Sequence, residues 1–600
     1  MSAIETDVLV LGGGPAGAWA AVSAAARGAR VVLVDKGRCG ASGPTAAGVG
    51  ILWNLPPGPA REEAVRQAFE QGGELGDPDW THRVLEEAHR RVDQLARWGQ
   101  RFPAELGGAR VRLDGASYLR RLRRRLREAG VCVLDQHPAL QLLVDRDGVV
   151  AGATGLRQHF HSWTVHAGAV VVATGGCAFL SGGAGTEGNT GDGLLLAAEA
   201  GAHLSGMEFS SAYGLAPVSV APAHPLPSEK LYDGSGAVLS DDSAAFAEIG
   251  QGRRVYAALD DLPTHTRSWL ARSGAVDPAG RVPLRPVLGG TVGGAGGLML
   301  TTPECATTVA GLYAAGAAAT REPIIGAASA FGGPGGSWAI ASGVWAGAGA
   351  ARFALDRGIP ASPRPVPGAG LSTRARIDPR AVVGLVQEHM LPLRRSYWRS
   401  AGSLRDSIAE LDAMWPGAQF DLGGSGADRL AARQAAALLA VARWTKYSAL
   451  ARTESRGMHL RTDHPEAAAA WRARLASGGL DRVWVHADAA PPGAPVAVVP
   501  AAAARVPLGR RLDGWAREES VELDPGVRRS SGQETVLAGA RADGAEPAEI
   551  AGFRRSPGQE SAAVAGFRRS AGQESALAGS SEAEAVASDE PAEPTTAVAS

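Results

Sequence analysis

A glycine-rich turn close to the start of the chain constrains the fold more than any other feature. Residues 7–11 (Asp-Val-Leu-Val-Leu) form a short apolar run typical of a buried parallel strand, and Gly12-Gly-Gly14-Pro-Ala-Gly17 follows it directly. The small, alanine-rich segment from Ala16 to Arg27 predicts a helix, and Val31–Val34 predicts the next parallel strand. The sequence therefore predicts a βαβ unit here.

The spacing of the glycines in this turn is typical of a dinucleotide-binding site. Gly12 permits the tight turn, Gly14 allows the backbone to approach a pyrophosphate, and Gly17 allows the helix to pack closely on the strand. The N-terminus of the helix then offers unpaired N–H groups to the phosphates. Asp35 ends the second strand, where a carboxylate suits the ribose hydroxyls of an adenosine half and disfavours a 2′-phosphate, so NADP is not expected.

A second strand-to-loop exit narrows the class of cofactor. Ala169–Ala173 is predicted to be a buried strand, and it ends in Thr174-Gly-Gly176. Such an exit is common by itself. In combination with the N-terminal βαβ unit it indicates a flavoprotein with two dinucleotide motifs rather than a plain NAD dehydrogenase, and the predicted cofactor is FAD.

The rest of the chain alternates between helical and strand-like stretches. Residues 62–129 and 375–460 carry helical patterns, and 131–153 alternates as a β-hairpin with its turn at Asp145–Gly148. The helical stretch Tyr118–Arg127 is rich in arginine. An anion-binding patch would explain those arginines, but a solvated helix face is the interpretation that we favour.

Composition argues against several functional classes. The 600 residues carry a formal net charge of −1, so no global field attracts nucleic acid or an anionic membrane. The four cysteines are far apart and form no Cys-x-x-Cys pair, which argues against an internal zinc or iron–sulfur site and against a disulfide framework. Neither a signal peptide nor an apolar run long enough to cross a bilayer is recognised, so no membrane span is expected and the cytoplasm is the expected compartment.

A series of motifs along most of the chain resembles one known family. Asn189-Thr-Gly-Asp-Gly193 is followed by Gly201–Leu204 and Met207-Glu-Phe209, and later by Gly311–Gly316 and Arg452–Arg461. In content and order the series is similar to that of the fumarate reductase/succinate dehydrogenase flavoproteins. That family includes L-aspartate oxidase and the flavin subunit of adenylylsulfate reductase.

The resemblance implies an α/β fold with a Rossmann-like FAD-binding domain, an inserted α+β capping domain and a C-terminal helical domain. The expected boundaries are 1–204 and 287–370 for the two parts of the FAD-binding domain, 205–286 for the capping domain, 371–470 for the helical domain and 471–514 for a small C-terminal segment. Residues 515–600 have few large apolar side chains and carry irregularly spaced copies of a short repeat. We expect a disordered tail there, with a docking element as the alternative.

The loop at residues 42–48 departs from the covalent members of the family. In those members a Ser-His-Thr segment links histidine to the flavin, whereas this chain reads Ser42-Gly-Pro44, with Gly43 at the histidine position. The FAD is therefore expected to be bound without a covalent bond. Ser42, Gly43 and Gly48 are more similar to the adenylylsulfate reductase form of the loop, and Ala317 replaces the glutamate that usually bonds the ribityl chain.

Together, the nucleotide motifs and the resemblance predict which residues contact FAD. They are Gly12, Gly14, Pro15, Ala16, Gly17, Asp35, Lys36, Ser42, Gly43, Ala46, Ala47, Gly48, Thr174, Gly175, Gly176, Asn189, Asp192, Gly316 and Ser337. No metal ligands are predicted.

The residues with which the family holds its substrate are missing. No arginine occurs between Arg321 and Arg352, where the family places the arginine that clamps a substrate carboxylate. The catalytic histidine aligns near Val292, and Ser210–Tyr213 replaces a glutamine–histidine–proline element. Because arginine clamps are how a site holds planar carboxylates, these losses argue against succinate, fumarate or aspartate as the substrate.

Four residues are candidates for the catalytic side of the site. Arg253 and Arg254 precede a strand-like run in the expected capping domain, and exposed loop arginines are an equally good interpretation. Tyr213 and Trp338 could stack on an aromatic substrate or on the flavin ring, although such side chains more often belong to the core. His203 is interpreted as a packed residue rather than as an acid or base.

Three functional hypotheses follow from these observations. The leading one is an FAD-dependent oxidoreductase that exchanges a hydride at flavin N5 with a small molecule other than a simple dicarboxylate. The alternative is the flavin subunit of an adenylylsulfate-reductase-like electron-transfer complex with a separate iron–sulfur or ferredoxin-like partner. The third is a scaffold without catalytic activity, which the intact glycine turn and Asp35 disfavour.

Overall fold

The computed structural model describes residues 3–488, apart from 103–108, 158–160, 227–229 and 263. By its internal contacts the chain divides into two units, Met1–Arg528 and Arg529–Ser600, and the second unit lies wholly outside the described residues. The predicted tail at 515–600 and the end of the predicted small segment at 471–514 lie outside them as well.

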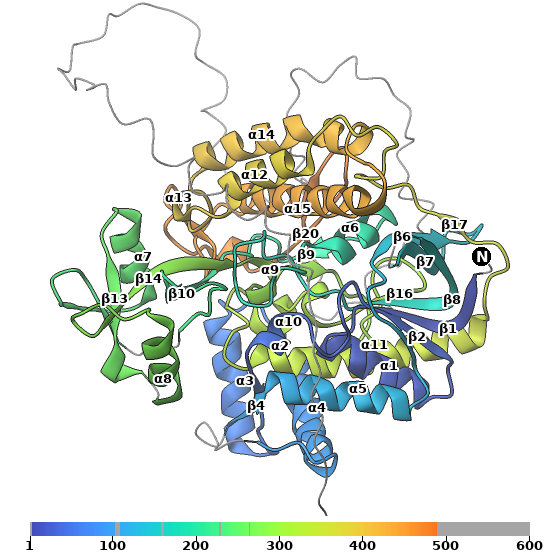
Figure 1. Ribbon diagram of the computed structural model, residues 1–600, viewed down its shortest axis with the longest axis horizontal. Helices are drawn as coiled ribbons and strands as arrows, with labels where there is room; N and C mark the ends of the chain where they lie inside the picture. The colour runs from blue at the N-terminus through green and yellow to red at the C-terminus, as the bar shows by residue number, and fades with distance from the viewer. Residues whose placement is uncertain (1–2, 103–108, 158–160, 227–229, 263, 489–600) are drawn as a thin grey trace, which may run out of the picture. The chain divides into compact units, whose positions relative to one another are not determined.

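The predicted N-terminal βαβ unit is confirmed. β1 (Ile4–Leu11), α1 (Pro15–Ala25) and β2 (Val31–Val34) follow one another, and β1 pairs with β2 in parallel. On its other side β1 pairs in parallel with β8 (Ser162–Val172), the strand predicted before Thr174-Gly-Gly176. The carboxyl ends of these three strands therefore lie at one edge of the sheet, where open α/β sheets bind their ligands (Figure 1).

These strands belong to an eight-stranded sheet in the order β17-β6-β7-β8-β1-β2-β5, with β16 also paired to β8. Its other members are β5 (Cys132–Leu134), β6 (Ala139–Val144), β7 (Val150–Leu156), β16 (Leu312–Ala314) and β17 (Arg364–Pro365). β6 and β7 form the predicted hairpin, and the Asp145 carboxylate stabilises its turn by accepting from the N–H groups of Asp147 and Val149. The central strands are buried on both faces, which explains their continuous apolar sequences.

Three helices cover the face of the sheet formed by β1, β2 and β8: α1, α5 (Gly115–Glu128) and α11 (Pro334–Arg357) (Figure 1). α1 and α11 pack at backbone distance. A Cβ atom added to Gly347 would lie 2.1 Å from the carbonyl oxygen of Ala20, and Ser23 Oγ donates to the carbonyl of Val344 at 2.7 Å. The small residues of both helices therefore set how closely α11 approaches the βαβ unit.

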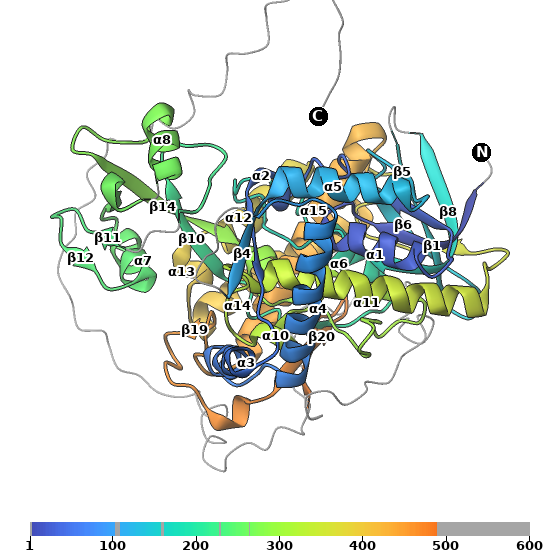
Figure 2. The ribbon, with the colours of Figure 1, turned by 90° about the horizontal axis from the view of Figure 1, so that it is seen from below.

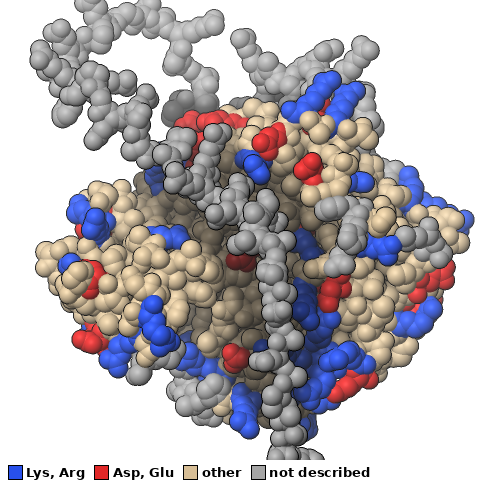
Figure 3. Space-filling view, in the orientation of Figure 1, with Lys and Arg blue, Asp and Glu red and all other residues tan. Residues whose placement is uncertain are grey.

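The arginine-rich helix predicted at Tyr118–Arg127 is α5, and its packing matches the helix-face interpretation. Leu119, Leu122 and Leu126 are buried, whereas most of its arginines are exposed or half-buried. Arg123 forms an ion pair with Asp135 at 2.6 Å. Figure 3 shows blue side chains gathered in the lower part of the view, with red side chains among them. Also on this side of the chain are β3 (Val49–Trp53), α3 (Pro59–Gln71), α4 (Pro78–Arg97) and β4 (Arg110–Asp114), of which β3 and β4 pair with each other (Figure 2).

A five-stranded sheet in the order β10-β14-β13-β11-β12 occupies the segment predicted to be a capping domain. It consists of β10 (Ala212–Pro217), β11 (Leu231–Tyr232), β12 (Val238–Leu239), β13 (Val255–Ala258) and β14 (Arg281–Gly289), with α7 (Asp242–Gly250) and α8 (Thr264–Ser273) packed on it. This sheet has its own apolar core, which includes Leu215, Phe246 and Val255. The segment is therefore an α+β insertion within the nucleotide-binding fold.

The predicted C-terminal helices are α12 (Pro379–Met390), α14 (Ala401–Phe420) and α15 (Gly426–Ala451), which form the upper layer in Figure 1. α15 is buried from Ala432 onward apart from Gln434 and Leu450, and its Arg433 forms a buried ion pair with Glu199 of α6 (Asp192–Glu199). Beside them lies a small sheet of β15 (Gly297–Leu298), β9 (Leu204–Ser205), β20 (Arg474–Gly478) and β21 (Trp484–Asp488).

None of the helices formed by the described residues combines the length and apolar character that a membrane crossing requires. Likewise, no group of three or more histidine, cysteine or carboxylate side chains in the described ranges is arranged to hold a metal ion.

The contact between α1 and α11 gives a first prediction. Replacing Gly347 with valine forces the two helix backbones apart, so we expect Gly347→Val to lower the free energy of unfolding by about 2–3 kcal/mol. Gly384 of α12 is exposed, and a Cβ atom there would meet nothing within 4 Å. Gly384→Ala should instead stabilise the protein by about 0.5–1 kcal/mol through helix propensity. Urea denaturation of both variants measures this, and equal effects would contradict the packing argument.

Candidate functional site

The three glycines of the N-terminal turn have two different structural roles. Gly12 has a positive φ of 106°, and a Cβ atom on it would lie 2.3 Å from the carbonyl oxygen of Ala173. At Gly17 an added Cβ would lie 1.8 Å from the carbonyl oxygen of Gly12. At Gly14 it would meet nothing within 4 Å. Gly12 and Gly17 are therefore needed for packing, whereas Gly14 borders open space.

The open space next to Gly14 lies at the N-terminus of α1. Gly14 is the N-cap residue and no side chain caps the helix, while Pro15 occupies its first turn. Ala16 and Gly17 follow with their side-chain positions buried. Helix N-termini carry unpaired N–H groups and a partial positive charge, so this end of α1 can receive the pyrophosphate of a dinucleotide.

Asp35 lies beside the turn, at the end of β2. Its carboxylate accepts hydrogen bonds from Gly13 N at 2.5 Å and from Gly37 N at 2.7 Å. Burial raises the pKa of Asp35, while the two backbone N–H groups oppose that shift. These bonds fix the carboxylate where a dinucleotide fold places its ribose-binding acid.

Lys36 connects this end of β2 to the start of α6. Its ammonium group lies 2.5 Å from the Asp192 carboxylate and donates to Thr190 Oγ1 at 2.9 Å. Thr190 Oγ1 in turn donates to Asp192 at 2.7 Å. The Asn189–Gly193 motif, distant in sequence, is thereby held at the same edge of the sheet as the glycine turn.

Two buried polar atoms near this edge lack a hydrogen-bond partner in the described part of the chain, Thr174 Oγ1 and Asn189 Oδ1. Gly175 passes so close to Asn189 that an added Cβ would lie 2.4 Å from its amide nitrogen. Buried polar groups are nearly always paired in native structures, so these two atoms are suited to a ligand. With the open space at Gly14 they fit the FAD that the sequence predicts.

The loop at residues 42–48 leads into the short helix α2 (Pro44–Ala47). Gly43 has a positive φ of 88° with nothing near its Cβ position, and its carbonyl lies beside Gly185. Ser42 Oγ donates to the carbonyl of Arg38. Ala46 is half-buried, whereas Ala47 and Gly48 are exposed. Gly43 has no side chain through which a flavin could be attached.

Two further predicted contact residues lie where β16 and α11 meet. Gly316 has a positive φ, donates its N–H to Ser342 Oγ, and accepts at its carbonyl from the Trp338 indole N–H at 3.0 Å. Ser337 is fully buried, and its hydroxyl accepts a hydrogen bond from Trp53 N at 2.8 Å. Ser337 therefore joins α11 to β3.

The four candidate catalytic residues lie in separate places. Arg253 and Arg254 are exposed in the turn before β13, and Arg253 is paired with Glu248. Tyr213 packs edge-on against Phe246 and Tyr397 and donates to the carbonyl of Leu391 at 3.0 Å.

Trp338 is fully buried and its ring packs against the half-buried rings of Trp80 and Trp345, so it occupies a core position. His203 lies in the loop after α6, edge-on to Trp484. Burial lowers the pKa of His203.

Two residues that the sequence did not single out face the segment around Val292. Arg321 is 3% exposed and donates to the carbonyls of Val292, at 2.9 Å, and Thr291. Burial lowers the pKa of Arg321 to about 9. Phe331 is 51% exposed, and its ring lies so close to Gly293 that an added Cβ would be 2.3 Å away. Neither residue belongs to a recognisable motif, and only the fold brings them together.

The Met207–Phe209 and Arg452–Arg461 motifs meet in a buried ion-pair network. Arg452 lies 2.9 Å from both Glu208 and Glu454, and Arg456 lies 2.7 Å from Glu454. Burial and the surrounding arginines lower the pKa of His459 well below its ordinary range. These ion pairs tie the segment after α15 to the segment after β9.

A parallel-sheet nucleotide fold with a second strand exit, an inserted α+β segment and a helical layer defines a two-part flavoprotein. A family model described as FAD binding domain matches residues 7–280, and one described as Fumarate reductase flavoprotein C-term matches residues 401–490. The chain thus carries an FAD-binding domain and a C-terminal domain of the fumarate reductase/succinate dehydrogenase flavoprotein type, and the members of that family are FAD-dependent oxidoreductases. FAD is the cofactor that these domain matches assign.

Curated relatives of the chain include several L-aspartate oxidases. That of Streptomyces coelicolor is 33% identical over 229 residues, which span 34% of this chain and 40% of the relative. That of Mycobacterium leprae is 27% identical over 522 residues, which span 77% of this chain and 93% of the relative. The chain thus matches less than half of the first relative's length and nearly all of the second's.

Solved structures share the fold at lower identity. FrdA of the E. coli quinol fumarate reductase superposes with a TM-score of 0.69 at 20% identity, over 82% of this chain and 98% of that one. Adenylylsulfate reductase from Archaeoglobus fulgidus superposes with a TM-score of 0.66 at 17% identity, over 81% of this chain and 96% of that one. The predicted fold class is therefore confirmed.

The different roles of Gly14 and Gly17 give a second prediction. The backbone at Gly14 has a φ of −73° that any residue can adopt, and its Cβ position is open. We expect Gly14→Ala to leave the melting temperature of the FAD-free protein unchanged within about 2 °C but to weaken FAD binding at least about tenfold, because the methyl group obstructs the pyrophosphate. Flavin fluorescence titration measures the affinity.

Gly17→Ala is the matched control. Its methyl group collides with the Gly12 carbonyl, so the FAD-free protein itself should be destabilised by about 2–3 kcal/mol. If both variants lowered stability equally, or if Gly14→Ala bound FAD normally, the assignment of the open space to the cofactor would be wrong.

Proposed function

We propose that this protein is an FAD-dependent dehydrogenase or reductase whose substrate is a small molecule other than a simple dicarboxylate. The observation that carries the proposal concerns the part of the site that would face the substrate. The arginine expected there from the family is missing, and an apolar side chain lies in its place. In the segment between Arg321 and Arg352, where relatives of this family would hold a carboxylate, the exposed side chain next to the Gly293 turn is Phe331.

The buried arginine beside this segment does not replace the missing clamp. The Arg321 guanidinium donates from Nη1 to the carbonyl of Val292 and from Nη2 to that of Thr291, so both terminal nitrogens are engaged by the backbone, and only the buried Nε has no hydrogen-bond partner among the described residues. A carboxylate clamp needs a free fork of N–H donors. The alignment position of the family's catalytic histidine, Val292, likewise offers no group that can carry a proton.

When bound, FAD supplies the hydride chemistry of the reaction. The chain positions it through the backbone at Gly14, the fixed carboxylate of Asp35 and the paired Lys36 and Asp192. Thr174 and Asn189 contribute the two unpaired buried oxygens. On the substrate side, the Phe331 ring favours an apolar or aromatic substrate portion and excludes water.

An anaerobic titration tests this proposal and gives a third prediction. We expect succinate and L-aspartate to leave the absorbance of the oxidised flavin in the purified holoprotein unchanged, whereas dithionite should bleach it. Fumarate should leave the reduced flavin unchanged. A substrate with an apolar portion should bleach the oxidised flavin if it is a reductant, or restore the absorbance of the reduced flavin if it is an oxidant, within seconds to minutes. Bleaching by L-aspartate would overturn the proposal and indicate that the relatives' activity is retained.

We also propose that the FAD is bound without a covalent bond, because Gly43 provides no attachment atom. Precipitation of the yellow holoprotein with acid should release all of the flavin into the supernatant and leave a colourless pellet. Gel electrophoresis of the denatured protein under ultraviolet light provides the control, since a fluorescent band at the protein's mass would reveal covalent flavin.

A second candidate function is the flavin subunit of an electron-transfer complex. The similarity of the Ser42–Gly48 loop to that of adenylylsulfate reductase favours it, and an iron–sulfur or ferredoxin-like partner would then carry the electrons. Purification from the native host under anaerobic conditions distinguishes the two. A brown small subunit that co-elutes with the flavoprotein supports the complex, whereas a yellow homo-oligomer with full flavin content opposes it.

A further inference from the structure

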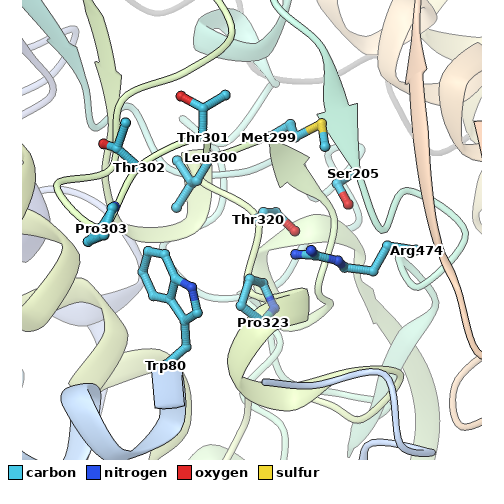
Figure 4. A pocket seen from close by; sticks show the side chains of 10 residues that line it. All are labelled: Trp80, Ser205, Met299, Leu300, Thr301, Thr302, Pro303, Thr320, Pro323 and Arg474. Atoms are coloured by element: carbon cyan, nitrogen blue, oxygen red, sulfur yellow. The ribbon is translucent and has the colours of Figure 1, made fainter. Parts of the chain in front are cut away.

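A small pocket lies between the β9–β20 sheet, the loop after β15 and α4. Its volume is about 60 Å³, several times the roughly 10–15 Å³ that one water molecule requires. None of its residues belongs to the predicted FAD contacts. The pocket is lined by Trp80, Ser205, Met299, Leu300, Thr301, Thr302, Pro303, Thr320, Pro323 and Arg474 (Figure 4).

Arg474 is the one charged side chain among these lining residues. Figure 4 shows its guanidinium group extending from β20 toward Thr320, across the pocket. The group forms no hydrogen bond or ion pair with another side chain in the described ranges, and Arg474 is only half exposed. Several other half-buried arginines are paired with carboxylates, as Arg123 is with Asp135 and Arg357 with Asp145. The guanidinium of Arg474 therefore has donors available to a ligand.

A buried carboxyl group lies behind the wall of the pocket. Ser205 Oγ donates to Glu322 Oε2, and the other oxygen of Glu322 has no hydrogen-bond partner among the described residues. Glu322 is fully buried. The charged groups that act on it are Glu208, Arg474 and Arg452. An unpaired oxygen in this position is costly unless a proton or a ligand satisfies it.

The rest of the lining limits the ligand. Thr301 donates to the carbonyls of Ala306 and Thr307, and Thr320 donates to the carbonyl of Ala295, so these hydroxyls are already engaged. Trp80, Leu300 and Pro323 add apolar surface. The pocket thus combines a single free cation with mostly apolar or engaged walls, and it holds only a few non-hydrogen atoms.

We propose that this pocket binds a small monocarboxylate, whose carboxylate pairs with the guanidinium fork of Arg474 and whose short apolar end lies against Trp80 and Leu300. A planar carboxylate matches the fork in two parallel hydrogen bonds, which chloride cannot form, and the apolar surface of Trp80 and Leu300 suits a methyl group better than the further oxygens of sulfate. The proposal does not depend on the substrate of the flavin, because the pocket shares none of the predicted FAD contacts.

The neighbouring carboxyl group gives the binding a pH dependence of defined sign. Burial and the charge of Glu208 raise the pKa of Glu322 to about 7. Below that pH Glu322 is neutral and Arg474 is available to an anion. Above it Glu322 becomes charged, attracts Arg474 and repels the ligand, so the affinity should fall as the pH rises from 6 to 8.

Calorimetric titration of the full-length, FAD-loaded protein with sodium acetate tests the proposal. Sodium chloride and sodium sulfate at matched ionic strength are the control anions. We expect saturable acetate binding with a Kd on the order of millimolar. The affinity at pH 6 should exceed that at pH 8 by at least about fivefold. Repeating the titration without FAD separates this site from the flavin site, since acetate binding should persist.

Four variants complete the test. Arg474→Gln and the pocket-filling Leu300→Trp should both abolish acetate binding. The control variant is Arg472→Gln. It removes an exposed arginine that lies two residues before Arg474 and is paired with Glu74, so acetate binding should be unchanged. Glu322→Gln should bind acetate equally well at both pH values.

Absence of saturable binding by wild-type protein at pH 6 overturns the proposal. Binding that survives in Arg474→Gln, or sulfate binding in place of acetate, overturns it too. Circular dichroism of each variant confirms that a lost signal is not a lost fold.

Discussion

Backbone-to-backbone contact at glycine holds the nucleotide-binding half of this protein together. Gly12 lies against the carbonyl of Ala173, Gly17 against the carbonyl of Gly12, and Gly347 against the carbonyl of Ala20. Each contact is closer than any side chain allows. Through them the start of α1 contacts β1 and the exit of β8, and the middle of α1 contacts α11. Gly14, between two of these contacts, borders open space.

A network of ion pairs between buried charged side chains is the second constraint on the structure. The arginines of the Arg452–Arg461 motif lie among Glu208 and Glu454, far from solvent. Removing one member of such a network leaves an uncompensated buried charge, which is why the motifs on both sides of it must be present together. The glutamate of Met207-Glu-Phe209 belongs to one part of the chain and the arginines to another, so the network fixes how the helical layer meets the nucleotide-binding fold.

The sequence predicted the elements of this fold well because their signals are local. The apolar run at 7–11, the glycine spacing and the Asp145–Gly148 turn each depend on neighbouring residues. The site was harder to predict from the sequence, because its remaining features depend on contacts between residues that are far apart in the chain. Nothing near Lys36 in sequence indicates that it meets Asp192, and nothing near Phe331 indicates that its ring lies on Gly293. Trp338 could not be distinguished from a stacking residue until its indole was seen bonded to Gly316 within the core.

The proposed cofactor and substrate sides of the site use different chemistry. For this reason the fold identifies the cofactor but not the substrate. The proposed cofactor side consists of backbone N–H groups, a helix N-terminus and glycines. Two of these glycines, Gly12 and Gly17, are also needed for the close packing of the fold. The resemblance to the family places the substrate-binding side chains near Val292 and in the segment between Gly326 and α11, and any residue of suitable size can occupy those positions. Alanine, phenylalanine and valine stand there in this chain, and Arg321 is bonded to backbone carbonyls. A scaffold held by glycine contacts can therefore keep its flavin while its substrate changes.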